Sequence, residues 1–129
     1  MYVVLHGANA STFVPGFAEM IGASHEVMQL SDALNGVGEA EAFSGADVVI
    51  GSWLSPSMPK LPRLRLFQVP GAGVEGIDRS LLCSGAQLCN CFGHESAIAE
   101  YVMAALLARH VPLAAADRDL RARRWTYWA

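Results

Sequence analysis

The stretch "ADVVIGSW", residues 46 to 53, decides the fold class of this 129-residue chain. Its apolar run Val48–Ile50 is uninterrupted and ends at Gly51, a pattern typical of a strand that is buried on both faces. Such strands belong to parallel sheets, whose crossover connections carry helices over the faces. The stretch therefore predicts an open parallel α/β sheet.

Short apolar segments on both sides of this stretch predict the rest of the sheet. Four of them read as strands: residues 2–7, 25–30, 64–70 and 87–91. Between the first two, four apolar residues recur on one face of a predicted helix: Phe13, Phe17, Met20 and Ile21. The alternation of strands and helices predicts five parallel strands in one sheet with flanking helices.

Glycine and proline shape the other connections. Gly36 and Gly38 weaken the helix predicted for residues 31–44, and Gly45 is a suitable C-terminal stop for it. Three prolines within residues 54–62 enforce a loop after the third strand. A short helix is predicted before Gly85.

The composition is that of a globular domain. Hydrophobic residues make up 53% of the chain and charged residues 16%, which is enough to build a core. The net charge of -3 gives no electrostatic basis for binding nucleic acid or an anionic membrane surface. No apolar run is long enough to cross a bilayer, and the first ten residues lack the basic region of a signal peptide. We therefore expect a cytoplasmic protein without a membrane or nucleic-acid partner.

The three cysteines, Cys83, Cys89 and Cys91, do not indicate a disulfide framework, because their number is odd and no secretion signal precedes them. Together with His94 they could be drawn as four zinc ligands. However, Cys89 and Cys91 have the spacing of a strand and not of a structural zinc site. We interpret the three thiols as small buried apolar groups and expect no metal.

Residues 95–110 predict a strong helix that ends before Pro112. Ile98 and Leu106 belong to one apolar face, and Met103 and Leu107 make the opposite side apolar too. A helix that is apolar nearly all round requires cover on several sides. A partner is therefore expected, either another domain or a second copy of the chain.

The C-terminal segment predicts a solvated helix. Asp117 with Arg121, and Asp119 with Arg123, have the i,i+4 spacing of ion pairs. Because the arginines alternate with aspartates, we do not interpret them as a nucleic-acid patch. Three aromatic residues close to the terminus would need a surface to pack on: Trp125, Tyr127 and Trp128.

The sequence G-A-G-V-E-G, residues 71 to 76, matches the glycine fingerprint of dinucleotide-binding folds. That fingerprint requires a full helix after the glycines and a carboxylate at the end of the next strand. Here only residues 77–86 precede the next predicted strand, which ends in Asn90 and Cys91. We therefore interpret the match as coincidental and expect no nucleotide at this loop.

The same loop has the features of a site for a small anion. It follows a predicted parallel strand at the carboxyl end, where open sheets bind ligands, and its small residues leave backbone N–H groups accessible. A carboxylate is the simplest guest. Ser52 and Trp53 follow the third strand at the same edge and are predicted to line the pocket. The alternative, that Trp53 only covers the edge of the sheet, is equally compatible with the sequence.

Three stretches, taken in order, resemble the N-terminal part of the D-isomer-specific 2-hydroxyacid dehydrogenases, the family of glyoxylate, hydroxypyruvate and phosphoglycerate dehydrogenases. They are "LPRLRLFQVPGAGVEGIDRSLLCSGAQLCN" (residues 61–90), "GHESAIAEYVMAALLA" (residues 93–108) and "LRARRW" (residues 120–125). The resemblance spans roughly residues 46 to 125, and the order of the motifs is more specific than any single one.

The resemblance implies a flavodoxin-like substrate-binding domain at residues 1–93, with an open parallel five-stranded sheet. Residues 94–129 would form a long interdomain helix and dimerisation segment that leads to a nucleotide-binding domain. The main-chain amides of Ala72, Gly73 and Val74 would contact the substrate carboxylate. The family's catalytic histidine lies further along its sequence, so His94 is expected to line the cleft or cap a helix.

The implied function is that of the substrate-binding domain of an NAD(P)-dependent oxidoreductase that interconverts 2-oxo acids and D-2-hydroxy acids. NAD or NADP would serve the intact enzyme, as a homodimer. The family's nucleotide fingerprint and catalytic residues are not among these 129 residues, so we expect the chain alone to hold no cofactor, to contain no catalytic residue and to be inactive. The alternative is a stand-alone flavodoxin-like binding or dimerisation module without redox activity.

Overall fold

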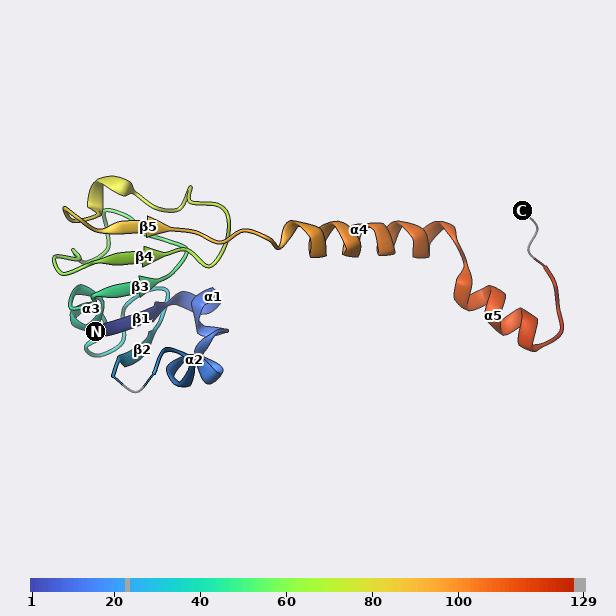
Figure 1. Ribbon diagram of the computed structural model, residues 1–129, viewed down its shortest axis with the longest axis horizontal. Helices are drawn as coiled ribbons and strands as arrows, with labels where there is room; N and C mark the ends of the chain where they lie inside the picture. The colour runs from blue at the N-terminus through green and yellow to red at the C-terminus, as the bar shows by residue number, and fades with distance from the viewer. Residues whose placement is uncertain (23, 127–129) are drawn as a thin grey trace. The chain divides into compact units, whose positions relative to one another are not determined.

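The computed structural model describes residues 1–22 and 24–126, and the five predicted strands form one sheet (Figure 1). Their order across the sheet is β2-β1-β3-β4-β5, and every neighbouring pair is parallel. The prediction of a parallel α/β sheet with flanking helices is therefore confirmed. The strands are β1 (Tyr2–His6), β2 (Glu26–Leu30), β3 (Val48–Ile50), β4 (Leu66–Gln68) and β5 (Gln87–Cys89).

The main core covers one face of the sheet. Val4, Val49 and Phe67 are neighbours in register on three adjacent strands, and each is 0% exposed. Phe43 and Leu30 complete the centre of this cluster. Burial of each such side chain contributes about 1.5–3 kcal/mol to stability.

The opposite face is covered unevenly. Val3 and Leu5 alternate with the core residues of β1 and are also buried. On the neighbouring strands, Val48, Ile50 and Leu66 remain half-buried. Cover on this face is therefore more complete over β1 than over β3 and β4.

Two short helices, α1 (Gly7–Ser11) and α2 (Val14–Ile21), replace the single helix predicted between the first two strands. Pro15 and Gly16 interrupt α2, since Pro15 has a ψ of 118° and Gly16 a φ of 79°. No residue of α2 is buried, and Met20 is 83% exposed. The predicted apolar face exists in the sequence but does not pack into the core.

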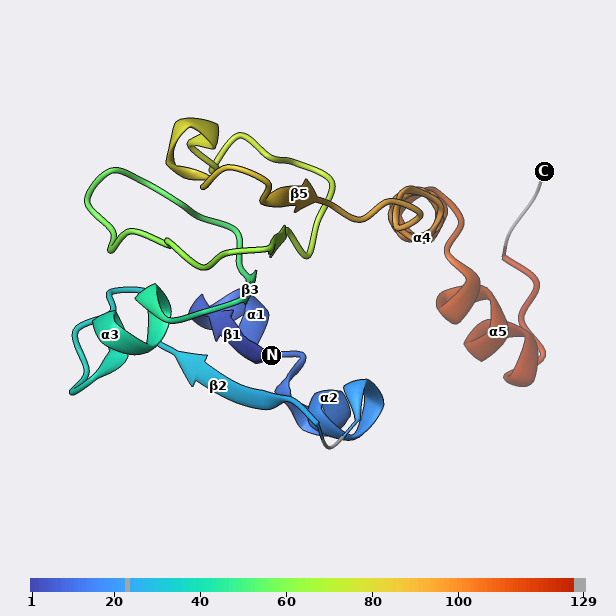
Figure 2. The same cartoon turned by 60° about the vertical axis from the view of Figure 1, so that its left-hand side comes forward.

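The third helix, α3 (Glu39–Ser44), lies beside β1 and β2 (Figure 2) and is shorter than predicted. It begins only after Gly38, whose φ is 77°. The Glu39 carboxylate accepts hydrogen bonds from the N–H groups of Ser31 and Gly36, both at 2.8 Å. The Ser31 hydroxyl also donates a hydrogen bond to this carboxylate. The hydroxyl bond is the largest cause of the lowered pKa of Glu39, and the two N–H bonds lower it further.

The two later connections contain almost no helix. Residues 51–65 form a loop between β3 and β4, and only a 3-10 turn, η1 (Arg79–Leu81), lies between β4 and β5. The Asp78 carboxylate accepts the Ser80 N–H at 3.0 Å and so caps this turn. The short helix predicted here is therefore reduced to three residues.

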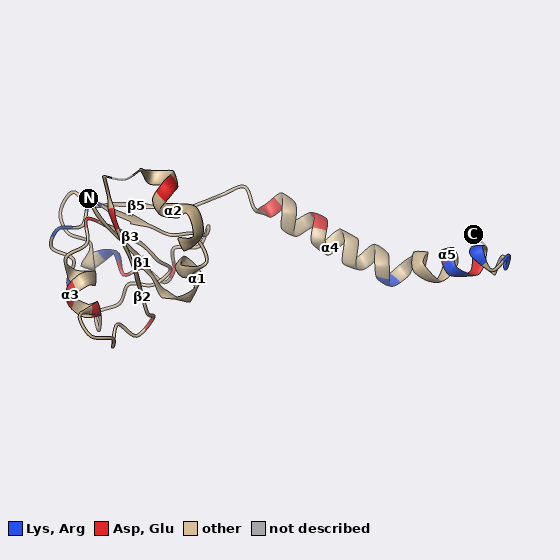
Figure 3. Ribbon diagram, turned by 90° about the horizontal axis from the view of Figure 1, so that it is seen from below, with Lys and Arg blue, Asp and Glu red and all other residues tan. Residues whose placement is uncertain are grey.

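The chain divides into two compact units, Met1–Phe92 and Gly93–Ala129. The second unit begins with α4 (Glu95–His110), whose bounds agree with the sequence prediction. The Glu95 carboxylate accepts the Gly93 N–H at 2.7 Å. All residues of α4 are exposed. Figure 3 shows α4 as mostly uncharged, with acidic residues towards its start and a basic residue near its end, which suits the helix dipole.

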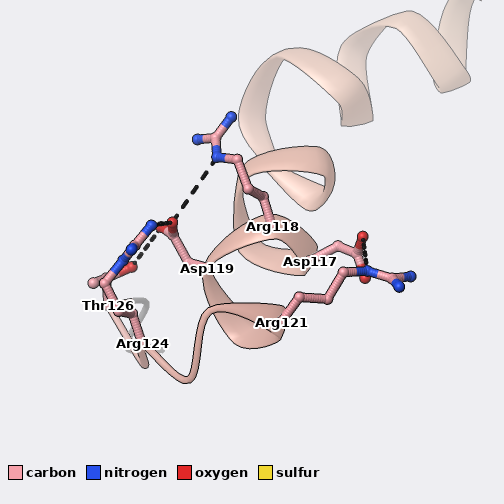
Figure 4. Close-up of polar contacts among 6 residues, drawn as sticks. All are labelled: Asp117, Arg118, Asp119, Arg121, Arg124 and Thr126. Atoms are coloured by element: carbon pink, nitrogen blue, oxygen red, sulfur yellow. Dashed lines mark hydrogen bonds and ion pairs between the residues drawn. The ribbon is translucent and has the colours of Figure 1, made fainter.

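The final helix, α5 (Leu113–Arg121), carries the ion pairs drawn in Figure 4. The predicted pair forms between Arg121 Nε and Asp117 Oδ2 at 2.9 Å. The predicted pair of Asp119 with Arg123 is wrong, because Asp119 accepts instead from Arg124 at 2.7 Å. The helix ends at Arg121, and Arg123 has a φ of 56°, so i,i+4 geometry is lost there.

The cysteines are less buried than predicted. Cys83 is half-buried and donates its thiol to the Leu64 carbonyl at 3.0 Å. Cys89 and Cys91 are exposed, because they lie in and after β5, which is an edge strand. Trp125 is 65% exposed, and Tyr127 and Trp128 lie outside the described residues.

Among the described residues, no single helix has both the length and the apolar composition needed to cross a membrane. The pair α4 and α5, bent by 49° at their junction, reaches that length and composition only when taken together.

Candidate functional site

The glycine-containing loop of residues 71–76, here called the amide loop, follows β4 and precedes η1. It therefore lies at the carboxyl end of a parallel strand, as predicted. In open parallel sheets this edge is where ligands bind. The loop is partly exposed, with Gly73 and Glu75 the most accessible of its residues.

Neighbouring segments anchor the amide loop through its carbonyl oxygens. Four of these oxygens accept hydrogen bonds: Gly71 from the Cys91 N–H at 2.9 Å, Ala72 from Asn90 Nδ2 at 2.7 Å, Val74 from the Ile77 N–H at 3.1 Å and Gly76 from the Leu54 N–H at 2.9 Å. The donors come from the segment after β5, from the loop after β3 and from the residue that follows the loop. The backbone of the loop is thus held from both sides.

The N–H groups of the same loop remain available. Within residues 1–22 and 24–126, no acceptor is hydrogen-bonded to the N–H of any residue from 71 to 76. Successive backbone N–H groups in a turn can bind an anion when they point to one place. An anionic oxygen can accept hydrogen bonds from several N–H groups, and each such charge-assisted hydrogen bond contributes about 1.5–3 kcal/mol.

Residue 76 must be glycine because there is no room for a side chain, and not because of its backbone conformation. None of Gly71, Gly73 and Gly76 has a positive φ. However, a Cβ on Gly76 would lie 2.5 Å from the Ser52 carbonyl oxygen and 3.1 Å from Trp53 Cε3. The two loops are joined at this point by the parallel bridge between Leu54 and Ile77.

Gly73 has more room than Gly76. A Cβ there would meet the Glu75 carboxylate, which is the end of a flexible and exposed side chain. The Glu75 carboxylate thus lies beside Gly73. A larger side chain at residue 73 would displace it and cover the N–H groups.

Ser52 and Trp53 adjoin the amide loop, as their position after β3 suggested. Ser52 is exposed. Trp53 is 58% exposed, and its ring edge lies next to Gly76. The structure therefore places Ser52 and Trp53 beside the Gly76 end of the loop that contains Ala72, Gly73 and Val74, while contact of any of them with a substrate stays a prediction.

His94 belongs to the second unit and precedes the first residue of α4. His94 is the N-cap residue of α4, and its carbonyl accepts the Ile98 N–H at 3.1 Å, but its side chain makes no capping hydrogen bond to the helix. The Glu95 carboxylate accepts the N–H of Gly93, which precedes the helix. A role for His94 in lining the cleft stays a prediction, because the two units are described separately.

His6 lies at the point where the strand order reverses, between β1 and β3, with Gly51 beside it. The side chain is 4% exposed, and its Nε2 lies 3.3 Å from the Asp32 carbonyl oxygen. Its Nδ1 is buried and has no hydrogen-bond partner among the described residues. Burial lowers the pKa of His6 and favours the neutral ring, which packs edge-on against Phe43 at 5.2 Å.

Sequence reasoning missed the residues that hold the loop in place. In the sequence, Asn90 stands out only because it is not the acidic residue that a dinucleotide site requires. In the structure, its side-chain amide donates a hydrogen bond to the Ala72 carbonyl. The available signal was its place at the end of β5, because adjacent parallel strands end at the same edge. Gly76 was grouped with the other glycines, and only its contact with Ser52 and Trp53 distinguishes it.

The structure contains no α-helix directly after the amide loop, where a dinucleotide site would place the pyrophosphate. Among the described residues, no three His, Cys, Asp or Glu side chains are grouped so that they could hold a metal ion. No family model, curated protein or solved structure matches this chain. The loop geometry and the sequence motifs are therefore the basis for a functional proposal.

Proposed function

We propose that this chain is the substrate-binding domain of an NAD(P)-dependent oxidoreductase that interconverts 2-oxo acids and D-2-hydroxy acids. The observation that carries the proposal is the amide loop, whose carbonyls are anchored while the N–H groups of residues 71 to 76 have no partner in the described chain. Such a loop matches the carboxylate shared by all substrates of this reaction. The motifs at residues 61–90, 93–108 and 120–125 point to the D-isomer-specific 2-hydroxyacid dehydrogenases.

The strand order supports a flavodoxin-like domain. The order β2-β1-β3-β4-β5, all parallel, corresponds to the 2-1-3-4-5 order of that fold. Ligands of such folds bind at the carboxyl ends of the strands, which is the edge that carries the amide loop. In this proposal α4 serves as the interdomain helix that leads towards a nucleotide-binding domain.

The residues of this chain bind and orient the substrate. The carboxylate accepts hydrogen bonds from the N–H groups of Ala72, Gly73 and Val74, so that the 2-oxo group is held in a single orientation. Ser52 and Trp53 form the adjacent wall. When bound to a nucleotide domain, the nicotinamide supplies or accepts the hydride, and an acid-base group is required there as well. The 129 residues alone are therefore expected to bind substrate without turning it over.

The apolar surface of α4 favours a second candidate function. Tyr101 is 76% exposed and Leu107 55%, although they lie on different sides of the helix. Exposed apolar surface of this extent marks an association site. Under the main proposal the homodimer forms through α4, whereas the alternative is a flavodoxin-like dimerisation module without any substrate.

Amide NMR spectra of the chain, titrated with pyruvate, test the main proposal. Pyruvate should shift the amide resonances of residues 71 to 76 in a saturable manner, because its carboxylate would accept hydrogen bonds from their N–H groups. Methyl pyruvate, which lacks the carboxylate, is the matched control and should leave them unchanged. Absence of any shift with pyruvate would leave the dimerisation module as the better candidate.

Gly73→Val sharpens the test. The valine side chain would cover the N–H groups, and the affinity for pyruvate should fall about tenfold or more, which corresponds to one lost charge-assisted hydrogen bond. NADH should shift none of the loop resonances in the unsubstituted chain. Binding of NADH that disappears in Gly73→Val would show that the glycine fingerprint is a nucleotide site after all.

A further inference from the structure

A cavity of about 370 Å³ lies at the same edge of the sheet as the amide loop. Its walls come from the segment after β2, from the start of α3 and from the loop after β3. Six residues give it its chemical character: Asp32, Leu34, Trp53, Ser55, Ser57 and Met58. None of them except Trp53 was singled out from the sequence.

Trp53 connects the cavity with the amide loop. Its Cε3 edge lies next to Gly76, and its side chain also lines the cavity. A 2-oxo acid whose carboxylate binds the amide loop would therefore pass Trp53, and the rest of the molecule would be directed to the cavity. This step rests on the function proposed above.

The charge in the cavity is negative. Asp32 is its only charged lining residue, and among the described lining residues none is basic. The Asp32 carboxylate is held in place because its Oδ2 accepts the Ala8 N–H at 3.2 Å.

The remaining surface of the cavity is part apolar and part hydroxylic. Leu34 and Met58 join Trp53 in contributing apolar wall. The hydroxyls of Ser55 and Ser57 lie 2.8 Å apart and can also bond to a guest. A neutral or cationic tail could pack against or pair with these groups, whereas an anionic tail would face the Asp32 carboxylate without any cation lining the cavity.

We propose that this cavity is the subsite for the substrate tail, and that it selects 2-oxo acids with a neutral or cationic far end over those that carry a second negative charge. Asp32 is the residue that determines this selection. Dicarboxylic and phosphorylated 2-oxo acids are accordingly poor ligands of this chain.

Three 2-oxo acids with different tail charges test the proposal on the chain as it is. They are 2-oxopentanoate with a neutral tail, 2-oxoglutarate with an anionic tail and 5-guanidino-2-oxopentanoate with a cationic tail. At low ionic strength 2-oxoglutarate should bind about fivefold more weakly than 2-oxopentanoate, and the cationic compound at least as tightly. All tails that bind should shift the Trp53 indole resonance, while the carboxylates shift the amides of residues 71 to 76.

Asp32→Asn should reduce the fivefold difference in affinity between 2-oxopentanoate and 2-oxoglutarate to about twofold or less. The asparagine oxygen can still accept a hydrogen bond from the Ala8 N–H, so the segment around residue 32 should stay in place. Asp47→Asn removes the same charge at the amino end of β3 and is the matched control, with the difference unchanged. An unaltered amide spectrum outside the cavity shows that each variant is folded.

The possible failures are distinguishable. If all three acids shift the amide loop with equal affinity, or if the Trp53 indole does not respond, the tail subsite is wrong and the proposed function stands. If none of them shifts the amide loop, the proposed function fails and the subsite fails with it.

Discussion

Gly76 lies where the loop after β3 meets the amide loop, and it tolerates no side chain. In Gly76→Ala the new Cβ would lie 2.5 Å from the Ser52 carbonyl oxygen. That oxygen cannot easily retreat, because the neighbouring Leu54 is tied to Gly76 and Asp78 by backbone hydrogen bonds of 2.9 Å. We expect the free energy of unfolding to fall by about 1–3 kcal/mol, as in other overpacked positions. Denaturation with urea measures it.

Gly71→Ala is the matched control for this substitution. Nothing lies within 4 Å of the position that its Cβ would take, and its φ is not positive. The free energy of unfolding should therefore stay within about 0.5 kcal/mol of its original value. Equal destabilisation by the two substitutions would show that the contact at Gly76 is not the cause.

His6 makes the free energy of unfolding depend on pH below about pH 7. Burial lowers the pKa of His6 in the folded state, although Asp32 and Glu39 oppose this effect. The unfolded chain, with an ordinary histidine pKa of about 6.5, therefore takes up the proton first as the pH falls. The free energy of unfolding should be fully maintained above about pH 7 and should decrease as the pH falls below about 6.5.

Thermal unfolding at a series of pH values measures this dependence. His6→Gln should flatten the curve between pH 7 and 5, because glutamine does not titrate and its amide can still donate to the Asp32 carbonyl. The carboxylates with lowered pKa, among them Glu39 and Asp47, act at lower pH and should be unaffected. A curve of equal slope in the variant would assign the dependence to another group.

At the scale of elements, the amide loop depends on the segment that follows β5. Asn90 Nδ2 donates to the Ala72 carbonyl at 2.7 Å. Asn90→Ala removes this bond, which should cost about 1 kcal/mol of stability and loosen the loop. We expect affinity for pyruvate to fall several-fold, as measured by the same amide titration.

Cys91→Ala is the control for Asn90→Ala. The Cys91 N–H donates to the Gly71 carbonyl at 2.9 Å, and this backbone bond survives the loss of the thiol. The affinity for pyruvate should therefore be nearly unchanged. A comparable loss in both variants would indicate a general disturbance of the segment and not a specific effect of the Asn90 amide.

At the scale of the whole molecule, α4 should drive association of two copies. Its residues are exposed, and its apolar side chains include Leu106 at 50% and Tyr101 at 76% exposure. The mass measured by light scattering should rise with concentration from that of one chain to that of two. Leu106→Lys should shift this transition about tenfold higher in concentration, since it places a charge in an apolar interface.

Ser84→Lys adds the same charge at an exposed position of the first unit and should leave the transition in place. A single-chain mass at all concentrations in the unsubstituted protein would contradict association through α4.

The sequence by itself determined the local elements and the class of the fold. Val48–Ile50 and the other apolar runs predicted five parallel strands, and residues 95–110 predicted the bounds of α4, because hydrophobic periodicity and helix-end signals act over a few residues. The Asp117–Arg121 pair was predictable for the same reason. The amide loop could be located as well, since its place after β4 follows from parallel strands alone.

Only the tertiary structure decided which distant residues meet. The contact of Gly76 with Ser52, the anchoring of Ala72 by Asn90 and the cavity beside Asp32 each join segments that are separate in sequence. These contacts depend on the order of the strands in the sheet and on where their loops meet, which the pattern of a single short segment does not specify. The exposure of Met20 likewise depends on how α2 packs and not on its own apolar pattern. Short stretches of sequence thus determine the individual helices and strands. The candidate site forms because parallel strands bring their carboxyl ends to one edge of the sheet.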